Sequence, residues 1–102
     1  MSLFNKENML EEVNACKAAG GVLLDVREPD EYADGHIPGS INVPVGSISE
    51  AAAHIPGKDT LVCVYCLSGY RAEAAAKALG QMGYTNVKNL GGIKAYKGKL
   101  ER

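Results

Sequence analysis

The chain lacks an excess of either charge and any long apolar run. Its 102 residues carry 11 Lys and Arg against 12 Asp and Glu, which gives a formal net charge of −1. This balance excludes bulk electrostatic attraction to nucleic acid or to an anionic membrane. No stretch approaches the roughly 20 apolar residues that a membrane-spanning helix needs. We therefore expect neither nucleic acid nor a membrane as a partner.

The chain also lacks a secretory signal and an even number of cysteines. Its N-terminus has no cationic start followed by an apolar block, and residues 1–3 fit either a native start or a cloning remnant. Cys16, Cys63 and Cys66 make an odd count, whereas a disulfide framework normally uses an even one. Reduced thiols in the cytoplasm are the simpler interpretation, although a secreted chain whose signal has been removed would look the same.

Apolar, β-rich segments alternate with helix-like segments, without internal repeats or low-complexity blocks. Strands are predicted at 22–26, 41–45, 60–65 and 86–90. Helices are predicted from a cap at Asn5 or Asn8 to Gly20, at 49–54 and at 71–82, with one helical turn in 27–32 and a short terminal helix near 93–97. This alternation predicts one α/β domain over residues 1–102, a small parallel β-sheet flanked by helices on both faces. Ligands of such sheets bind at the carboxyl ends of the strands.

The segment VCVYCLSGYR, residues 62–71, places a thiol at one of these carboxyl ends. Cys66 ends the most apolar strand, and four residues separate it from Arg71, where a helix begins. The N–H groups of a tight loop and of a helix start can surround an anion, and Gly69 permits the backbone angles of such a loop. Arg71 can hold an oxyanion. The pattern predicts a Cys66 thiolate nucleophile beside an anion site. The alternative is a cysteine that only packs.

Cys63 and Cys66 have a C-x-x-C spacing, which can signal a redox dithiol or half of a metal site. Cys63 lies inside a strand, so the two Cα atoms should be about 10 Å apart, with side chains on opposite faces. That distance excludes a disulfide. His36, His54 and Cys16 are too scattered to complete a zinc site. We expect Cys63 in the core, no metal and no cofactor.

Three segments together resemble the rhodanese-like sulfurtransferase family. They are LLDVREPDEYADGHIPGSINVP (23–44), LVCVYCLSGYRA (61–72) and VKNLGGIKAY (87–96), in the family's order and spacing. The resemblance implies the small parallel α/β fold. It also implies that Cys66 takes a sulfane sulfur from thiosulfate or another anionic donor as a persulfide. The persulfide then passes the sulfur to a thiol or to cyanide.

The resemblance implies roles for the residues that follow Cys66. The loop amides would hold the anionic persulfide; they belong to Leu67, Ser68, Gly69, Tyr70 and Arg71. Arg71 would also bind the sulfonate end of the donor, and the Ser68 hydroxyl would reach the sulfur. Leu67 and Tyr70 would set donor and acceptor preference, unless they serve only to pack the loop.

The upstream segment supplies structural charge in this family. The resemblance places Asp25 and Arg27 near the active loop, with Arg27 paired to Glu31, and it makes His36 a turn residue rather than a general base. The chain departs from the family at Ala72, where serine is frequent, and at Tyr96, where tryptophan is common. The N-terminal strand usual in the family is hard to find. These departures leave the nucleophile in place.

Three other functions compete. Phosphatases and arsenate reductases also close a cysteine loop with arginine, but their loop has five intervening residues and suits a phosphoryl group. A non-catalytic binding module would be expected to lose Cys66 or Arg71. A protein-to-protein persulfide relay would share the chemistry and differ only in the donor.

Overall fold

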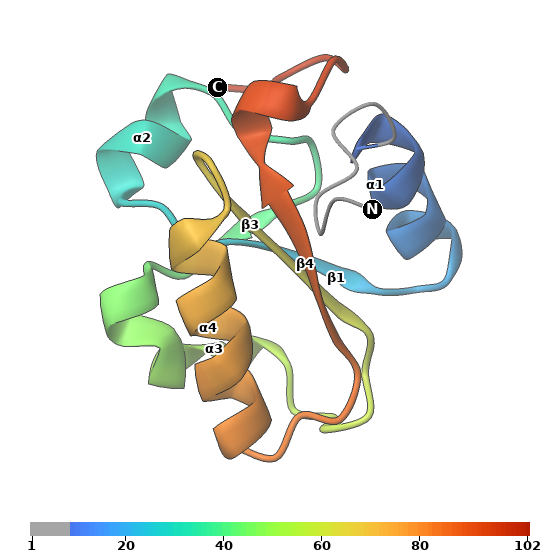
Figure 1. The fold of residues 1–102 in the computed structure, drawn as a ribbon, viewed down its shortest axis with the longest axis vertical. Coiled ribbons are helices and arrows are strands. Elements are labelled where there is room, and N and C mark those ends of the chain that lie inside the picture. The colour runs from blue at the N-terminus through green and yellow to red at the C-terminus, as the bar shows by residue number, and fades with distance from the viewer. Residues whose placement is uncertain (1–8) are drawn as a thin grey trace.

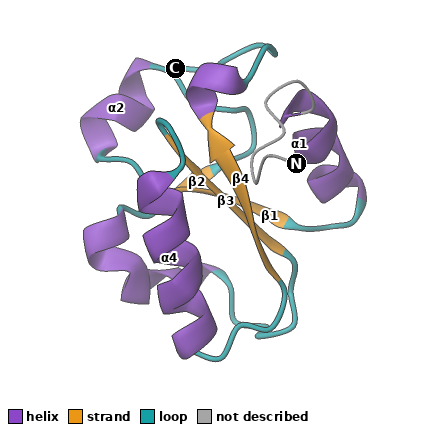
Figure 2. Ribbon diagram, in the orientation of Figure 1, coloured by secondary structure: helices purple, strands orange, loops and turns teal. Residues whose placement is uncertain are grey.

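Four parallel strands form the sheet of the protein, in a computed structural model that describes residues 9–102. The strands are β1 (Val22–Asp25), β2 (Ile41–Asn42), β3 (Val62–Cys66) and β4 (Val87–Gly92). Their order in the sheet is β2-β1-β3-β4, and every pairing is parallel (Figures 1 and 2). β3 is central and every one of its five residues is buried, as its apolar sequence predicts.

Helices cover both faces of this sheet. α1 (Met9–Ala18) lies on one face, and α3 (Ala51–His54) and α4 (Tyr70–Gln81) lie on the other (Figure 1). α2 (Pro29–Asp34) follows the carboxyl end of β1. The predicted fold class, a parallel α/β sheet flanked on both faces, is confirmed.

Each face of the sheet has its own hydrophobic cluster. On the α4 side the buried Ala72, Ala75 and Leu79 pack against the strands, because small alanines let the helix approach closely. On the α1 side Met9, Val13 and Cys16 are buried. Leu10, which follows Met9 in α1, is 39% exposed. The predicted caps Asn5 and Asn8 lie outside the described residues.

The segment after β1 departs most from the prediction. The strand expected over 41–45 ends at Asn42, because its pairing with β1 becomes irregular there: the N–H groups of Val43 and Val45, two residues apart, donate to the adjacent carbonyls of Asp25 and Val26. A 3₁₀ helix, η2 (Val45–Glu50), begins immediately afterwards, with non-helical backbone angles at Ser47. The helix expected over 49–54 is therefore a 3₁₀ helix followed by one turn of α-helix in α3. The short terminal helix expected over 93–97 is η3 (Ile93–Ala95).

The order in which the chain adds strands to the sheet changes side between β1 and β3, although all strands stay parallel. From β1 the chain moves outward to β2, and from β3 it moves to β4 on the other side. In open parallel sheets the crevice at such a reversal, outside the carboxyl ends of the strands, is where ligands bind. Asp25 ends β1, and Cys66 ends β3 beside it. The longest described helix, α4, has 12 residues, and no helix within residues 9–102 could cross a bilayer.

Candidate active site

The loop between β3 and α4 curls around the sulfur of Cys66. The backbone N–H of Gly69 donates to Sγ at 3.0 Å, and that of Ala72, in the first turn of α4, donates at 3.3 Å. Gly69 has φ of 110°, a left-handed conformation that glycine adopts readily. Two amides and the positive end of a 12-residue helix therefore face one sulfur atom. Hydrogen-bond donors and a helix start arranged in this way favour negative charge at the position that they face.

The amide contacts differ partly from the expectation. Of the five loop residues predicted to hold the sulfur, Gly69 contacts it in this structure, whereas the contact from Ala72 was not predicted. Ser68 is exposed. Within residues 9–102, the hydrogen bonds to Cys66 Sγ come from the backbone N–H groups of Gly69 and Ala72 rather than from the Ser68 hydroxyl. Leu67 is 38% exposed and Tyr70 83% exposed, so both present apolar surface beside the loop.

Arg71 forms a two-pronged ion pair with Glu31 of α2. Its two terminal nitrogens donate to the two carboxylate oxygens at 2.7 and 3.0 Å. The hydrogen bond to Arg71 lowers the pKa of Glu31 to about 2. The same bond, with a smaller contribution from Cys66, raises the pKa of Arg71. In this structure the Arg71 side chain is therefore held by α2.

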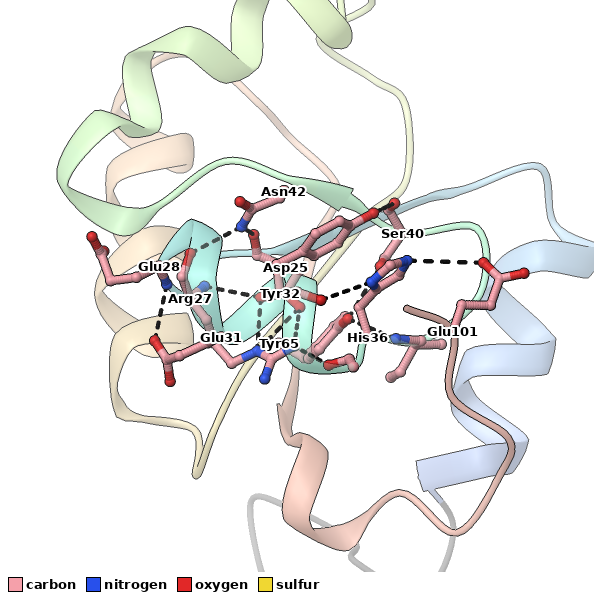
Figure 3. Close-up of polar contacts among 12 residues, drawn as sticks. Asp25, Arg27, Glu28, Glu31, Tyr32, His36, Ser40, Asn42, Tyr65 and Glu101 are labelled. Atoms are coloured by element: carbon pink, nitrogen blue, oxygen red, sulfur yellow. Dashed lines mark hydrogen bonds and ion pairs between the residues drawn. The ribbon is translucent and has the colours of Figure 1, made fainter.

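The predicted pair of Arg27 with Glu31 is wrong. Arg27 binds Asp25, with Nη2 at 2.7 Å from Oδ2, and Nη2 also donates to the carbonyl of Gly35 at 2.8 Å (Figure 3). Burial alone would lower the pKa of Arg27, but hydrogen bonds and charge from Asp25 more than offset it, and the pKa is raised. Arg27 and Asp25 are 5% and 0% exposed. This buried pair anchors the segment that leads into α2.

His36 lies beside this anchor, with both ring nitrogens near other groups. Nδ1 is 2.9 Å from the carbonyl oxygen of Tyr32, and Nε2 is 3.8 Å from the Glu101 carboxylate (Figure 3). The ring stacks on Tyr32 with centroids 3.7 Å apart. These contacts indicate a structural role for His36, which connects α2 to the C-terminal segment.

Two residues of β4 that the sequence reasoning missed support the loop. Asn89 Nδ2 donates to the Gly69 carbonyl at 3.3 Å, and Asn89 Oδ1 accepts from the N–H of Gly91 at 2.8 Å, beside a break in the β3–β4 register. A Cβ on Gly92 would overlap the Leu67 carbonyl oxygen and lie 2.5 Å from Ser68 Cα. Gly91 and Gly92 stand out in the sequence, but no feature of the neighbouring residues indicated that the backbone of Leu67 and Ser68 packs against Gly92.

The protein matches the rhodanese-like domain family over residues 6–99. The chain belongs to the rhodanese-like sulfurtransferase family. It is 42% identical over 72 residues to the thiosulfate sulfurtransferase PspE of Escherichia coli, covering 70% of this chain and 69% of PspE. It is 43% identical over 77 residues to a thiosulfate:glutathione sulfurtransferase of Saccharomyces cerevisiae, covering 64% of this chain and 55% of the yeast protein.

The fold of this rhodanese-like chain also matches solved structures. A structure described as a rhodanese with anions from Escherichia coli superposes with a TM-score of 0.76 at 35% identity, over 80% of this chain and 98% of that one. The chain therefore agrees with this family in both sequence and fold.

The other two thiols of this rhodanese-like chain lie on the opposite face of the sheet from Cys66. Cys63 and Cys16 pack in the α1-side cluster, whereas Cys66 belongs to the α4-side cluster, so the predicted separation of Cys63 from Cys66 is confirmed. Both thiols line a cavity of about 360 Å³ beside α1. Burial and contact with Cys16 raise the pKa of Cys63. Cys63 is therefore protonated and a poor nucleophile at neutral pH.

Proposed function

We propose that residues 1–102 form a single rhodanese-like domain that transfers sulfane sulfur through a persulfide on Cys66. The observation that carries the proposal is the pair of amide bonds to the sulfur, from Gly69 and Ala72, at the start of α4. These donors favour an anionic sulfur both before and after transfer. The family membership and the names of the relatives support the same reaction.

The first half-reaction loads the enzyme. The Cys66 thiolate attacks the outer sulfur of thiosulfate, an S–S bond forms to Cys66, and the bond to the sulfonate sulfur breaks with its electron pair on the departing sulfite. Charge is conserved, and no proton moves, so no general base is required. In our proposal Arg71 supplies a hydrogen-bonding edge for the sulfonate oxygens. Leu67, Ser68 and Tyr70 are exposed on the same loop.

The second half-reaction unloads the enzyme. An acceptor thiolate, or cyanide, attacks the outer sulfur of the Cys66 persulfide. The sulfur leaves as a new persulfide or as thiocyanate, and the Cys66 thiolate returns to the Gly69 and Ala72 amides. The name of the yeast relative supports a small thiol as acceptor. We expect the reaction in a reducing compartment, the cytoplasm, where such thiols are abundant.

Asp25, Arg27 and Glu31 have supporting roles in this proposal. The buried Asp25–Arg27 pair holds the start of α2, and α2 brings Glu31 to Arg71. Arg27 also lies over the ring of Tyr65, 5.9 Å from its centroid, one residue before the nucleophile. None of these three groups is needed to donate or accept a proton.

Mass spectrometry of the intact protein after treatment with thiosulfate tests the proposal. One added sulfur is expected on Cys66, and Cys66→Ser should lower turnover with thiosulfate and cyanide by roughly a thousandfold or more. Cys63→Ser is the matched control and should keep the added sulfur. Wild-type turnover by the Cys66→Ser protein would contradict the assignment.

A phosphate ester offered in parallel addresses the rival phosphatase function. The four-residue spacing of Cys66 and Arg71 gives a ring around one sulfur atom, contacted by the amides of Gly69 and Ala72. We expect no Cys66-dependent hydrolysis of p-nitrophenyl phosphate. Hydrolysis that Cys66→Ser abolishes would favour the phosphatase.

A further inference from the structure

The anion-binding arginine of the loop already has a carboxylate partner in this structure. Arg71 and Glu31 are joined by two hydrogen bonds, and their side chains are 33% and 28% exposed. The pKa of Glu31 is lowered to about 2, so its carboxylate stays ionised at neutral pH. The pair therefore presents no net charge to a donor that approaches Cys66.

Hydrogen bonding to a donor remains possible in this arrangement. A guanidinium has five N–H groups, and Glu31 takes two of them, one on each terminal nitrogen. Arg71 can keep its partner and still offer other N–H groups to a sulfonyl oxygen. Glu31 thus removes most of the long-range attraction for an anion and leaves the short-range contact.

The loop exposes apolar side chains at two positions, and the exposed Lys94 lies next to it, with its backbone N–H donating to the Leu67 carbonyl at 3.3 Å. Tyr70 is 83% exposed and Leu67 is 38% exposed, and they lie on either side of Ser68 and Gly69. An organic group on a donor would find contact surface there. A small, strongly hydrated dianion would gain nothing from it.

We propose that Glu31 is a specificity-determining residue that favours singly charged organic sulfane-sulfur donors, such as thiosulfonates or persulfides, over the thiosulfate dianion. The inference rests on the proposed sulfur transfer and names its donor class. The reaction balances as before: Cys66 takes the outer sulfur of a thiosulfonate, and the sulfinate leaves with the electron pair of the broken S–S bond.

A matched pair of donors isolates the charge. Thiosulfate and methanethiosulfonate carry the same transferable sulfur on a sulfonyl group but differ by one charge. In Glu31→Gln, kcat/KM should rise roughly tenfold for thiosulfate and roughly threefold for methanethiosulfonate at low salt, since a dianion gains twice as much from the freed charge. Glutamine also keeps the capping position at the start of α2.

Asp30→Asn is the control, because it makes the same change of net charge on the same helix. Asp30 is exposed, and no ion pair of its carboxylate is present among residues 9–102. The ratio of the two kcat/KM values should stay within about twofold of wild type in Asp30→Asn. An equal shift in both variants, or no gain for thiosulfate in Glu31→Gln, would overturn the inference.

A measurement on the wild-type protein covers the case in which Glu31→Gln does not fold. Because the Arg71–Glu31 pair is neutral, wild-type kcat/KM for thiosulfate should change less than about twofold between about 20 and about 200 mM salt. A steep fall would contradict the inference. Failure of the proposed function is seen separately, as the absence of Cys66-dependent turnover with both donors, and it removes the inference as well.

Discussion

At the scale of single residues, the site depends on close backbone approach as much as on reactive side chains. Gly92 has an extended backbone, with φ of −125°, so the conformation alone would accept any residue. What requires glycine is the space, because the backbone of Leu67 and Ser68 occupies the position of a side chain. The loop therefore takes its shape partly from a strand that follows it by some 20 residues.

We predict that Gly92→Ala moves the loop and lowers turnover by roughly tenfold to a hundredfold, because backbone atoms must shift to admit the methyl group and the amides no longer point at Sγ. Steady-state kinetics with thiosulfate measure the loss. Gly80→Ala is the control: a Cβ there meets nothing within 4 Å, and alanine should stabilise the helix by about 0.5–1 kcal/mol. Full activity in Gly92→Ala would show that the loop is more compliant than the packing indicates.

Residue types and spacing in the sequence predicted Cys66, Gly69 and Arg71 as the centre of the candidate site, and in the structure the N–H of Gly69 donates to Cys66 Sγ. They also separated Cys66 from Cys63, because alternation along a strand sends neighbouring odd and even positions to opposite faces. The partner of Arg27 was predicted wrongly. Four carboxylates lie within four residues of Arg27 in the sequence, and only the path of the chain into α2 decides that Asp25 meets it.

At the scale of elements, α2 is tied to the loop between β3 and α4 by the Glu31–Arg71 pair. Glu31 also accepts a hydrogen bond from the N–H of Glu28 at 2.9 Å, so one carboxylate caps its own helix and holds the loop arginine. The helix is short, and its described residues include no buried side chain. Its position therefore depends on these polar contacts more than on apolar packing.

We predict that the Glu31–Arg71 pair makes the free energy of unfolding depend on pH in the acidic range. The folded pKa of Glu31 lies near 2, below its usual value of 4.5, so the stabilising effect is complete above pH 4.5 and is lost as the pH falls toward 2. It should amount to about 1 kcal/mol, because both groups are partly exposed to water. Urea unfolding of wild type and Arg71→Met should give a difference that shrinks across this range. A difference that stays constant with pH would show that the pair does not hold α2.

At the scale of the whole molecule, both hydrophobic clusters share one sheet. Val13 on the α1 side and Leu79 on the α4 side are fully buried, and β3 contributes side chains to both clusters. Loss of either cluster would expose one face of the central strand β3 to water. The two faces should therefore unfold together.

We predict a single cooperative transition in which calorimetric and van't Hoff enthalpies agree. Leu79→Ala should destabilise the protein by about 2–5 kcal/mol, and Val13→Ala somewhat less, because each leaves a cavity in a buried cluster. Each substitution should lower the one Tm without splitting the transition. A separate early transition in Val13→Ala would mean that α1 unfolds independently, and it would contradict the single-domain proposal.

The sequence alone determined what depends on neighbours along the chain. Alternating segments predicted the parallel α/β fold, and the spacing of Cys66 and Arg71 at a strand–helix junction predicted an anion-stabilising loop, because backbone N–H groups there are oriented by local geometry. Only the tertiary structure decided which charges meet and which backbones touch. Glu31 and Arg71 are 40 residues apart in the sequence. Gly92, at the end of β4, lies against the backbone of Leu67, which follows β3. Such contacts depend on how helices and strands are placed in space, and local sequence patterns carry no direct record of that placement.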